Sequence, residues 1–296
     1  MKKSTIIITI AALIIPAFIN GKTVRRTLGI VQNSVPETTE LATEEMEFIY
    51  DYKYCVDTTG LISDNYVSDP MVLQISPTGL SKFSSHKNLT VDSIINTITD
   101  EQRMAAASEG KLSNGEFMTI FKNYPEGKLT HTEKICTDWF KYEEEMPQFD
   151  WELTDSTITI LGYECHEAKC HFRGRDWMVY YTPDIPLMEG PWKFNGLPGL
   201  IMKATDSKGE YSFECIGINS KASRKITIYN IPFNTTSRRK FYDTKHLYEC
   251  NPYAYAETTA GIHVTVRDTA GNIVLDAFDP IDPLFDFIET DWRDKK

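Results

Sequence analysis

The 296-residue sequence has no tract rich in proline, glycine or serine, no block of like charges and no repeat of fixed period. These absences disfavour solenoids and arrays of linker-joined modules. Hydrophobic residues make up 41% and charged residues 25% of the chain, which is typical of a globular protein. We find no internal boundary and therefore predict a flexible lead-in over residues 22–43 and a single β-rich domain over residues 44–296.

The short motifs that mark common catalytic sites are also missing. There is no G-x-S-x-G nucleophile elbow, H-E-x-x-H pair, Walker loop or G-x-G-x-x-G turn. Six histidines and 42 acidic residues are present, but no spacing selects a catalytic set among them. The formal net charge of −11 disfavours a general basic surface for nucleic acid or anionic lipid. We predict no nucleic-acid partner and no cofactor, and we favour a protein that is not an enzyme.

Only the N-terminus carries a long apolar run. The positive "MKK" precedes "STIIITIAALIIPAFIN", which is shorter than the ~20 residues that span a bilayer and contains Pro16. This layout predicts a secretory signal peptide over residues 1–21. No later stretch is apolar enough for a transmembrane helix, so we expect an exported chain that is periplasmic, outer-membrane-associated or secreted.

Cysteine is infrequent but even in number. In an oxidising compartment six cysteines allow fifteen complete disulfide pairings, and buried free thiols are the alternative. The six are Cys55, Cys136, Cys165, Cys170, Cys215 and Cys250.

Two cysteines and two histidines gather in "ECHEAKCHF", at Cys165, His166, Cys170 and His171. The surrounding alternation predicts a strand, on which Cys165 and His171 would share one face about 20 Å apart at about 3.3 Å per residue. His166 and Cys170 would share the other face. Neither pair could then hold one ion, so we predict no metal here; a metal or redox site that uses these four residues remains an alternative.

Alternation of period two dominates the chain. Phe48, Tyr50, Tyr52 and Tyr54 fall on one face of a strand, and about a dozen such segments predict an α+β fold that is mostly antiparallel β. Helical spacing predicts one helix within residues 88–108, capped by Thr90, and another over 236–249, capped by Ser237. Residues 262–278 read as a hairpin, and the acidic tail that follows them is predicted to be irregular.

A connection rich in proline and glycine, "TPDIPLMEGPWKFNGLPGL", joins two predicted strands. Proline fixes φ and glycine permits tight turns, so the segment should be rigid. It is too apolar for an idle loop, and it would either close one end of the core or line a ligand groove. The residues of interest are Trp192, Phe194, Gly196, Leu197, Pro198, Gly199, Leu200 and Ile201.

The hexapeptide "GLPGLI" at 196–201 resembles the signature of the GLPGLI family of exported Bacteroidetes proteins, whose function is uncharacterised. The resemblance covers about residues 149–218 and includes "FDWEL", "ILGYECHEA", "GRDWMVYYT" and "GPWKFNGLPGLI". It implies a single curved antiparallel sheet or an open half-barrel, with one or two helices, and a place near outer-membrane TonB-dependent receptors. The family has a cysteine at the position of Cys165 but not regularly at Cys170, and it supplies no catalytic residues.

Three functions follow as hypotheses. The first is a non-catalytic envelope protein that binds an outer-membrane receptor, a peptide or a hydrophobic ligand. The second is a secreted hydrolase whose site is assembled from distant residues. The third is a metal or redox protein that uses the Cys165–His171 cluster.

Overall fold

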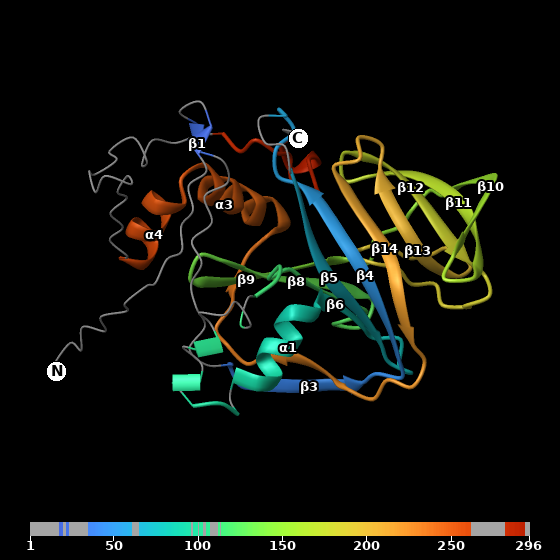
Figure 1. The fold of residues 1–296 in the computed structure, drawn as a ribbon, viewed down its shortest axis with the longest axis horizontal. Coiled ribbons are helices and arrows are strands. Elements are labelled where there is room, and N and C mark those ends of the chain that lie inside the picture. The colour runs from blue at the N-terminus through green and yellow to red at the C-terminus, as the bar shows by residue number, and fades with distance from the viewer. Residues whose placement is uncertain are drawn as a thin grey trace.

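The computed structural model describes most of the chain from residue 35 onward (Figure 1). Most of the predicted signal peptide and the predicted hairpin at 262–278 lie outside the described residues. The described residues are 35–60, 65–95, 114–261 and 282–293, with the short pieces 18–19, 22–23, 97–99, 101–102, 105–106 and 112.

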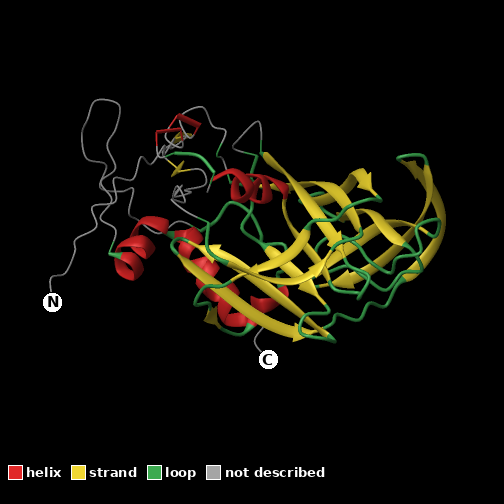
Figure 2. Cartoon of the chain, turned by 90° about the horizontal axis from the view of Figure 1, so that it is seen from below, coloured by secondary structure: helices red, strands yellow, loops and turns green. Residues whose placement is uncertain are grey.

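One twelve-stranded sheet dominates the described part of the chain. In spatial order its strands are β10 (Glu152–Ile160), β11 (Tyr163–Phe172), β12 (Arg175–Thr182), β13 (Leu200–Asp206), β14 (Tyr211–Asn219), β4 (Met46–Cys55), β5 (Tyr66–Ile75), β6 (Ser81–Ser85), β7 (Thr119–Lys122), β8 (Lys128–Ile135), β9 (Asp138–Glu145) and β16 (Asn234–Thr235). Neighbours are antiparallel except for β9 and β16. The sheet curves without closing into a barrel (Figure 2). The predicted α+β, mostly antiparallel fold is confirmed.

Two short strand pairs lie outside the large sheet. Strand β1 (Phe18–Ile19) pairs with β2 (Lys22–Thr23), and β3 (Thr38–Thr43) pairs with β15 (Lys225–Tyr229). Strands therefore also occur before residue 44, with β1 in the predicted signal peptide and β2 and β3 in the predicted lead-in. The polar sequence of β3 gave no apolar alternation, and its partner β15 lies far away in the chain.

Three α-helices with defined bounds accompany the sheet in the described part of the chain, where one or two were expected. They are α1 (His86–Ile95), α3 (Arg238–Cys250) and α4 (Pro252–Ala260), and a 3-10 helix, η2 (Asp291–Arg293), follows. The helix predicted at 236–249 is confirmed as α3, and the side chain of Ser237 caps it by accepting from the backbone N–H of Lys240. Helix α4 was missed although Asn251 caps it and Pro252 occupies its first turn, both of which are recognised start signals.

The helix predicted within residues 88–108 is shorter than its apolar stripe suggested. Helix α1 already begins at His86, so Thr90 lies inside it and the prediction of Thr90 as a cap was wrong. Residues 97–99 are not helical, which places the C-terminal end of the apolar stripe outside α1, but residues 101–102 and 105–106 within the predicted range are helical.

The main core lies on one face of the curved sheet and contains residues of β4–β8, of β10–β14 and of the connection between β12 and β13. Phe48, Tyr50, Tyr52 and Tyr54 are all buried, which confirms the alternation predicted for β4. The ring of Tyr52 stacks on Phe213 with centroids 4.7 Å apart, an arrangement that adds to simple burial of aromatic area.

A second core joins helix α3 to strands β8 and β9 and to the C-terminal segment 282–293. Its largest members are Tyr142, Phe241, Tyr242, Phe287 and Trp292. In Figure 1 helices α3 and α4 lie on the side of β8 and β9, away from β10–β12.

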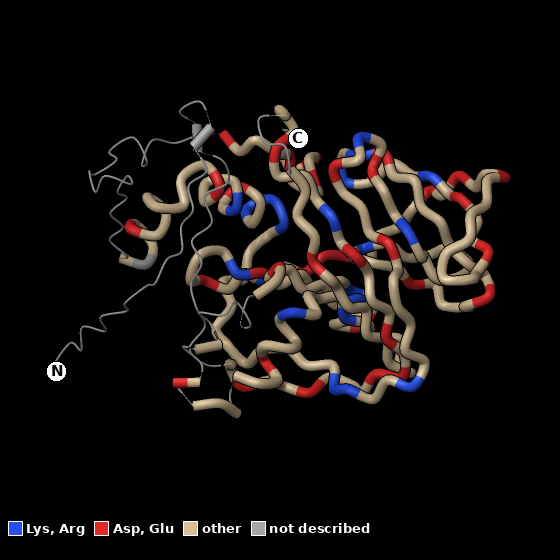
Figure 3. Tube along the Cα trace, in the orientation of Figure 1, with Lys and Arg blue, Asp and Glu red and all other residues tan. Residues whose placement is uncertain are grey.

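Figure 3 shows acidic positions spread over the whole trace with basic positions between them. Among the described residues, no helix has the length and apolarity needed to cross a bilayer.

Candidate functional site

The connection between β12 and β13 carries the residues singled out in the sequence, and most of them lie in the main core. Trp192, Phe194, Leu200 and Ile201 are fully buried and Leu197 is 2% exposed. Trp192 and Phe194 pack against each other with ring centroids 5.2 Å apart. Because these aromatic rings offer no exposed surface, their position supports the core-closing alternative and gives no support to a ligand groove here.

Close backbone contacts explain the small residues of the same connection. A Cβ atom on Gly199 would lie 2.1 Å from the carbonyl oxygen of Thr182, so only glycine fits. Gly196 and Pro198 are exposed, and Gly196 has a φ of 88°, which favours glycine. The hexapeptide therefore forms a tight turn, after which β13 pairs with β12.

A buried lysine of strand β7, Lys122, forms hydrogen bonds with the backbone of this connection. The Nζ atom of Lys122 donates to the carbonyl oxygens of Gly190 at 2.7 Å and Phe194 at 3.0 Å, and it pairs with Glu189. Lys122 is fully buried, and burial lowers its pKa while Glu189 opposes that effect. Three polar partners around one ammonium group compensate for its removal from water.

A second buried lysine belongs to the connection itself. Lys193 is fully buried, and its Nζ lies 2.6 Å from Glu289, 2.5 Å from Glu144 and 3.1 Å from the hydroxyl of Tyr142. Burial opposes ionisation of Glu289, but Lys193, Arg173 and Arg238 outweigh it and lower the pKa of that carboxyl to about 2.

The hydrogen bonds continue from Tyr142 toward helix α3. The hydroxyl of Tyr142 lies 3.1 Å from Nδ1 of His131, and Nε2 of His131 lies 3.0 Å from Glu133. Because Tyr142 accepts from Lys193, its own proton points to Nδ1, and neutral His131 then donates from Nε2. Glu133 also binds Lys245 at 2.6 Å. This polar chain links the connection, strands β8 and β9, and α3.

Ionisation within the polar chain follows from its contacts. Burial lowers the pKa of His131, although Glu133 opposes the shift. Burial opposes ionisation of Glu133, but Lys245 and His131 outweigh it and lower its pKa to about 2. These groups are satisfied by one another, and Tyr142, His131 and Glu133 are buried, so we assign them a structural role.

A pocket among the described residues lies elsewhere, between α1, β6, β7, β9 and β15. It holds about 50 Å³ of space. It is lined by Lys82, Ser84, Ser85, Asn88, Leu89, Asp92, Phe117, Thr119, Phe121, Thr132, Trp139, Thr227, Ile228, Tyr229 and Phe233.

Two polar side chains of β6 define the inner wall of this pocket. Lys82 and Ser84 are two residues apart on one strand and therefore face the same side. The Nζ atom of Lys82 donates to the carbonyl oxygen of Thr227 at 2.9 Å, and burial lowers the pKa of Lys82 to about 8. Ser84 is 5% exposed, and its hydroxyl has no hydrogen-bond partner among the described residues.

A carboxyl group and aromatic rings complete the pocket. Burial raises the pKa of Asp92, and the hydroxyl of Tyr229 donates to that carboxyl and opposes the shift. The half-buried ring of Trp139 meets Tyr229 edge to face at 5.1 Å and Phe117 at 5.8 Å between centroids. Apolar walls with a few convergent polar groups are the usual lining of a ligand site, but such sites commonly enclose about 300–1,000 Å³, several times the space here.

The cluster in β11 does not form a site in this structure. Cys165 and Cys170 both lie in the main core, so the predicted placement of Cys165 with His171 on one face and Cys170 with His166 on the other was wrong. The pairing register of β10 shifts opposite residues 166–168, where the alternation of β11 breaks. His171 is exposed and binds Asp176 at 2.7 Å. All six cysteines lie in the described residues and all are free thiols.

Sequence reasoning missed every polar residue of the pocket. Lys82, Asp92, Trp139 and Tyr229 come from four separate elements, and no local spacing connects them. A lysine and a serine on a strand whose five residues are all buried would have been the available signal, because buried lysines are rare without a purpose.

Comparison with known proteins gives one short family match. A family model described as "Protein of unknown function (Porph_ging)" matches residues 174–203. The match falls inside the segment that resembles the GLPGLI family and is consistent with a Bacteroidetes-type family, but it does not name GLPGLI. No curated protein matches the chain.

Among solved structures, two crystal forms of PNGF-II are similar to this chain. The C2 form has a TM-score of 0.44 at 14% identity, and the P21 form has 0.44 at 15%. Each alignment covers 68% of this chain and 32% of that chain, so this chain spans about a third of the proteins it matches. Similarity at this level carries no argument about fold or function.

Proposed function

We propose that this chain is an exported, non-catalytic binding protein whose pocket receives the small, hydrogen-bond-accepting end of an otherwise apolar ligand. A carboxylate suits the inner wall, because it accepts from the Ser84 hydroxyl and is attracted by the Lys82 ammonium group. A space of about 50 Å³ admits such a head group but not a whole ligand. The apolar remainder would contact the rings of Phe117 and Trp139 at the rim.

The single observation that carries the proposal is the unpartnered hydroxyl of Ser84. A buried polar group without a partner costs about 1–3 kcal/mol. Within the described residues this hydroxyl lines a pocket beside a buried lysine, so a bound acceptor would recover that cost. An apolar side chain at this position would avoid the cost but would recognise nothing polar.

Export and partner belong to the same proposal. The N-terminal segment 1–21 supports export to the periplasm, the outer-membrane surface or the medium. The resemblance of residues 149–218 to exported proteins supports an accessory role beside an outer-membrane TonB-dependent receptor. We also propose that residues 44–296 form a single domain.

Ligand-observed NMR with short probes of equal chain length tests the proposal. Hexanoate should bind the purified protein more tightly than hexanol, and hexylamine should not bind at the pocket. Ser84→Val should weaken hexanoate binding by about tenfold, the worth of one hydrogen bond to a charged group. Ser156→Val, which alters an exposed serine of β10, serves as the matched control. Equal binding of hexanoate and hexylamine would overturn the proposal.

The hydrolase hypothesis retains one favourable observation at the same place. Lys82, with a pKa of about 8, and Ser84 are the residue types of serine–lysine hydrolases. However, no hydrogen bond joins them among the described residues, whereas an activated nucleophile normally bonds to its base. Labelling of Ser84 by a fluorophosphonate, absent in Ser84→Ala, would favour the hydrolase; an unlabelled protein that binds hexanoate favours the binding protein.

A further inference from the structure

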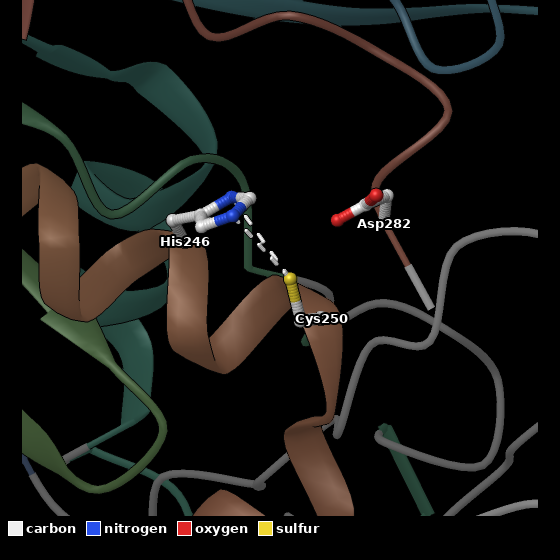
Figure 4. A group of neighbouring side chains, drawn as sticks. All are labelled: His246, Cys250 and Asp282. Atoms are coloured by element: carbon white, nitrogen blue, oxygen red, sulfur yellow. Dashed lines mark hydrogen bonds between the residues drawn. The ribbon is translucent and has the colours of Figure 1, made fainter. Parts of the chain in front are cut away.

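Helix α3 and the C-terminal segment bring three metal-ligating side chains together. His246 and Cys250 lie one helical turn apart on α3, and Asp282 approaches them from the start of segment 282–293 (Figure 4). One ligand atom from each residue lies within 4.8 Å of the other two. Figure 4 shows the carboxylate of Asp282 directed toward the imidazole and the thiol.

The spacing of the two helical ligands matches a tetrahedral zinc centre. Zinc–sulfur bonds of about 2.3 Å and zinc–nitrogen bonds of about 2.05 Å, held at a tetrahedral angle, place sulfur and nitrogen about 3.6 Å apart. The Sγ atom of Cys250 lies 3.6 Å from Nε2 of His246. An i, i+4 pair on a helix holds this separation without any change of backbone.

The third ligand needs only a small adjustment. Asp282 is exposed, so its side chain can rotate toward the helix without disturbing the core. Its carboxylate would complete a Cys–His–Asp set and leave a fourth position for water. Thiolate and imidazole ligands favour zinc over calcium or magnesium, which prefer oxygen ligands alone.

We infer that His246, Cys250 and Asp282 form a Zn²⁺ site with three protein ligands and one open position. Binding forms bonds from the metal to the sulfur, the imidazole nitrogen and a carboxylate oxygen. The thiol proton of Cys250 leaves to buffer, and no electron is transferred. The metal ties the start of segment 282–293 to the C-terminal half of α3, whereas Arg238 at the start of the helix contacts Glu289 and Asp291.

Titration of the metal-free protein with Co²⁺, followed by displacement with Zn²⁺, tests the inference. We expect one Co²⁺ per chain and the charge-transfer band of a cobalt–thiolate bond, with intense visible bands of a tetrahedral centre. Zn²⁺ should abolish both. Absence of the thiolate band, or octahedral weak bands alone, would overturn the inference.

Substitutions assign the ligands. Cys250→Ser should remove the charge-transfer band, and His246→Ala should weaken Co²⁺ binding by more than about 100-fold, beyond the loss expected for an outer partner. Asp282→Asn should weaken binding less than His246→Ala does. His166→Ala and His171→Ala are matched controls, because both histidines lie in β11 and outside the cluster. A band that persists in Cys250→Ser, or that disappears with the controls, would contradict the assignment.

Hydrogen exchange provides a readout that does not depend on the absorption bands of Co²⁺. Zn²⁺ should slow exchange of the backbone amides in segment 282–293 of the wild type and leave those of Asp282→Asn unchanged. Circular dichroism of each variant verifies that it is folded. Equal protection of wild type and Asp282→Asn would exclude Asp282 as a ligand.

Discussion

Lys193 forms an ion pair with Glu289 at 2.6 Å, and both side chains are fully buried. Lys193 precedes Phe194 in the apolar connection, whereas Glu289 lies near the C-terminus. The pair therefore joins two segments that are distant in sequence. A buried ion pair contributes little net stability compared with apolar residues, but loss of Lys193 would leave the buried carboxylate of Glu289 with only Arg173 and Arg238 as cationic partners among the described residues.

The first prediction concerns this ion pair. Lys193→Met should lower the free energy of unfolding by about 3 kcal/mol, measured by urea denaturation, because Glu289 and Glu144 lose a shared cation. Lys203→Met is the matched control: its pair with Glu214, at 2.7 Å, is partly exposed, and its loss should cost less than about 1 kcal/mol. Equal effects of the two substitutions would contradict the structural role of Lys193.

Acid should destabilise the protein through Glu133 and Glu289. Both carboxyls have folded-state pKa values of about 2, below the ordinary 4.5, so the unfolded chain binds more protons between these values. Their stabilising contribution is therefore complete above about pH 4.5 and is lost as the pH falls toward about 2.

Urea denaturation across this range measures the effect. Glu133→Gln should make the dependence of unfolding free energy on pH shallower, whereas Glu152→Gln, on the exposed side of β10, should leave it unchanged. A Glu133→Gln slope identical to that of the wild type would show that Glu133 is not held ionised by its partners.

The tight turn at Gly199 should tolerate no side chain. Gly199→Ala should lower the unfolding free energy by about 3 kcal/mol, because the new Cβ would overlap the Thr182 carbonyl group. Gly217→Ala, whose Cβ would meet Ile49 at an ordinary 3.6 Å, should change it by less than about 1 kcal/mol. Thermal or urea unfolding of both variants measures the difference, and a well-tolerated alanine at 199 would contradict the described contact.

The pocket should show opposite effects on stability and binding. Ser84→Val removes a buried hydroxyl that has no partner, so it should raise the free energy of unfolding by about 1 kcal/mol while it weakens hexanoate binding. A gain in stability at the expense of a ligand contact is typical of a residue kept for binding. A Ser84→Val protein that is destabilised would indicate a structural role for the hydroxyl.

Binding of a carboxylate should also depend on pH through Lys82. Burial lowers the pKa of Lys82 to about 8, while Asp92 and Glu44 oppose the shift, so the ammonium charge is present below that pH and lost above it. Hexanoate affinity should therefore fall as the pH rises through about 8. Lys82→Met should bind hexanoate weakly at every pH, and a wild-type affinity independent of pH would argue against contact with Lys82.

Local patterns predicted much of the fold, because they determine which side of an element faces the core. The alternation in β4 and the capped helix α3 follow directly from residues 46–55 and 236–249. The apolar stripe within residues 88–108 predicted a longer helix than α1. Strand β3 was missed because its pairing depends on the distant strand β15.

The candidate sites were much harder to predict. The i, i+4 spacing of His246 and Cys250 was visible in a predicted helix, but only tertiary structure brings Asp282 near them. The position of Lys193 among aromatic residues indicates that it is buried with an acidic partner, but the sequence does not identify Glu289 as that partner. The pocket combines residues between 82 and 233, a juxtaposition that no local pattern encodes.

The most direct test of the binding proposal is native mass spectrometry of the protein purified from its own cells, with identification of any molecule that co-purifies. The account predicts an apolar ligand with an acidic or other acceptor end group, bound to the wild type and to Ser156→Val but absent from Ser84→Phe, which fills the pocket. Unfolding curves verify that Ser84→Phe is folded. A ligand retained equally by Ser84→Phe, or a wild-type protein that is always recovered without ligand and does not bind hexanoate, would contradict it.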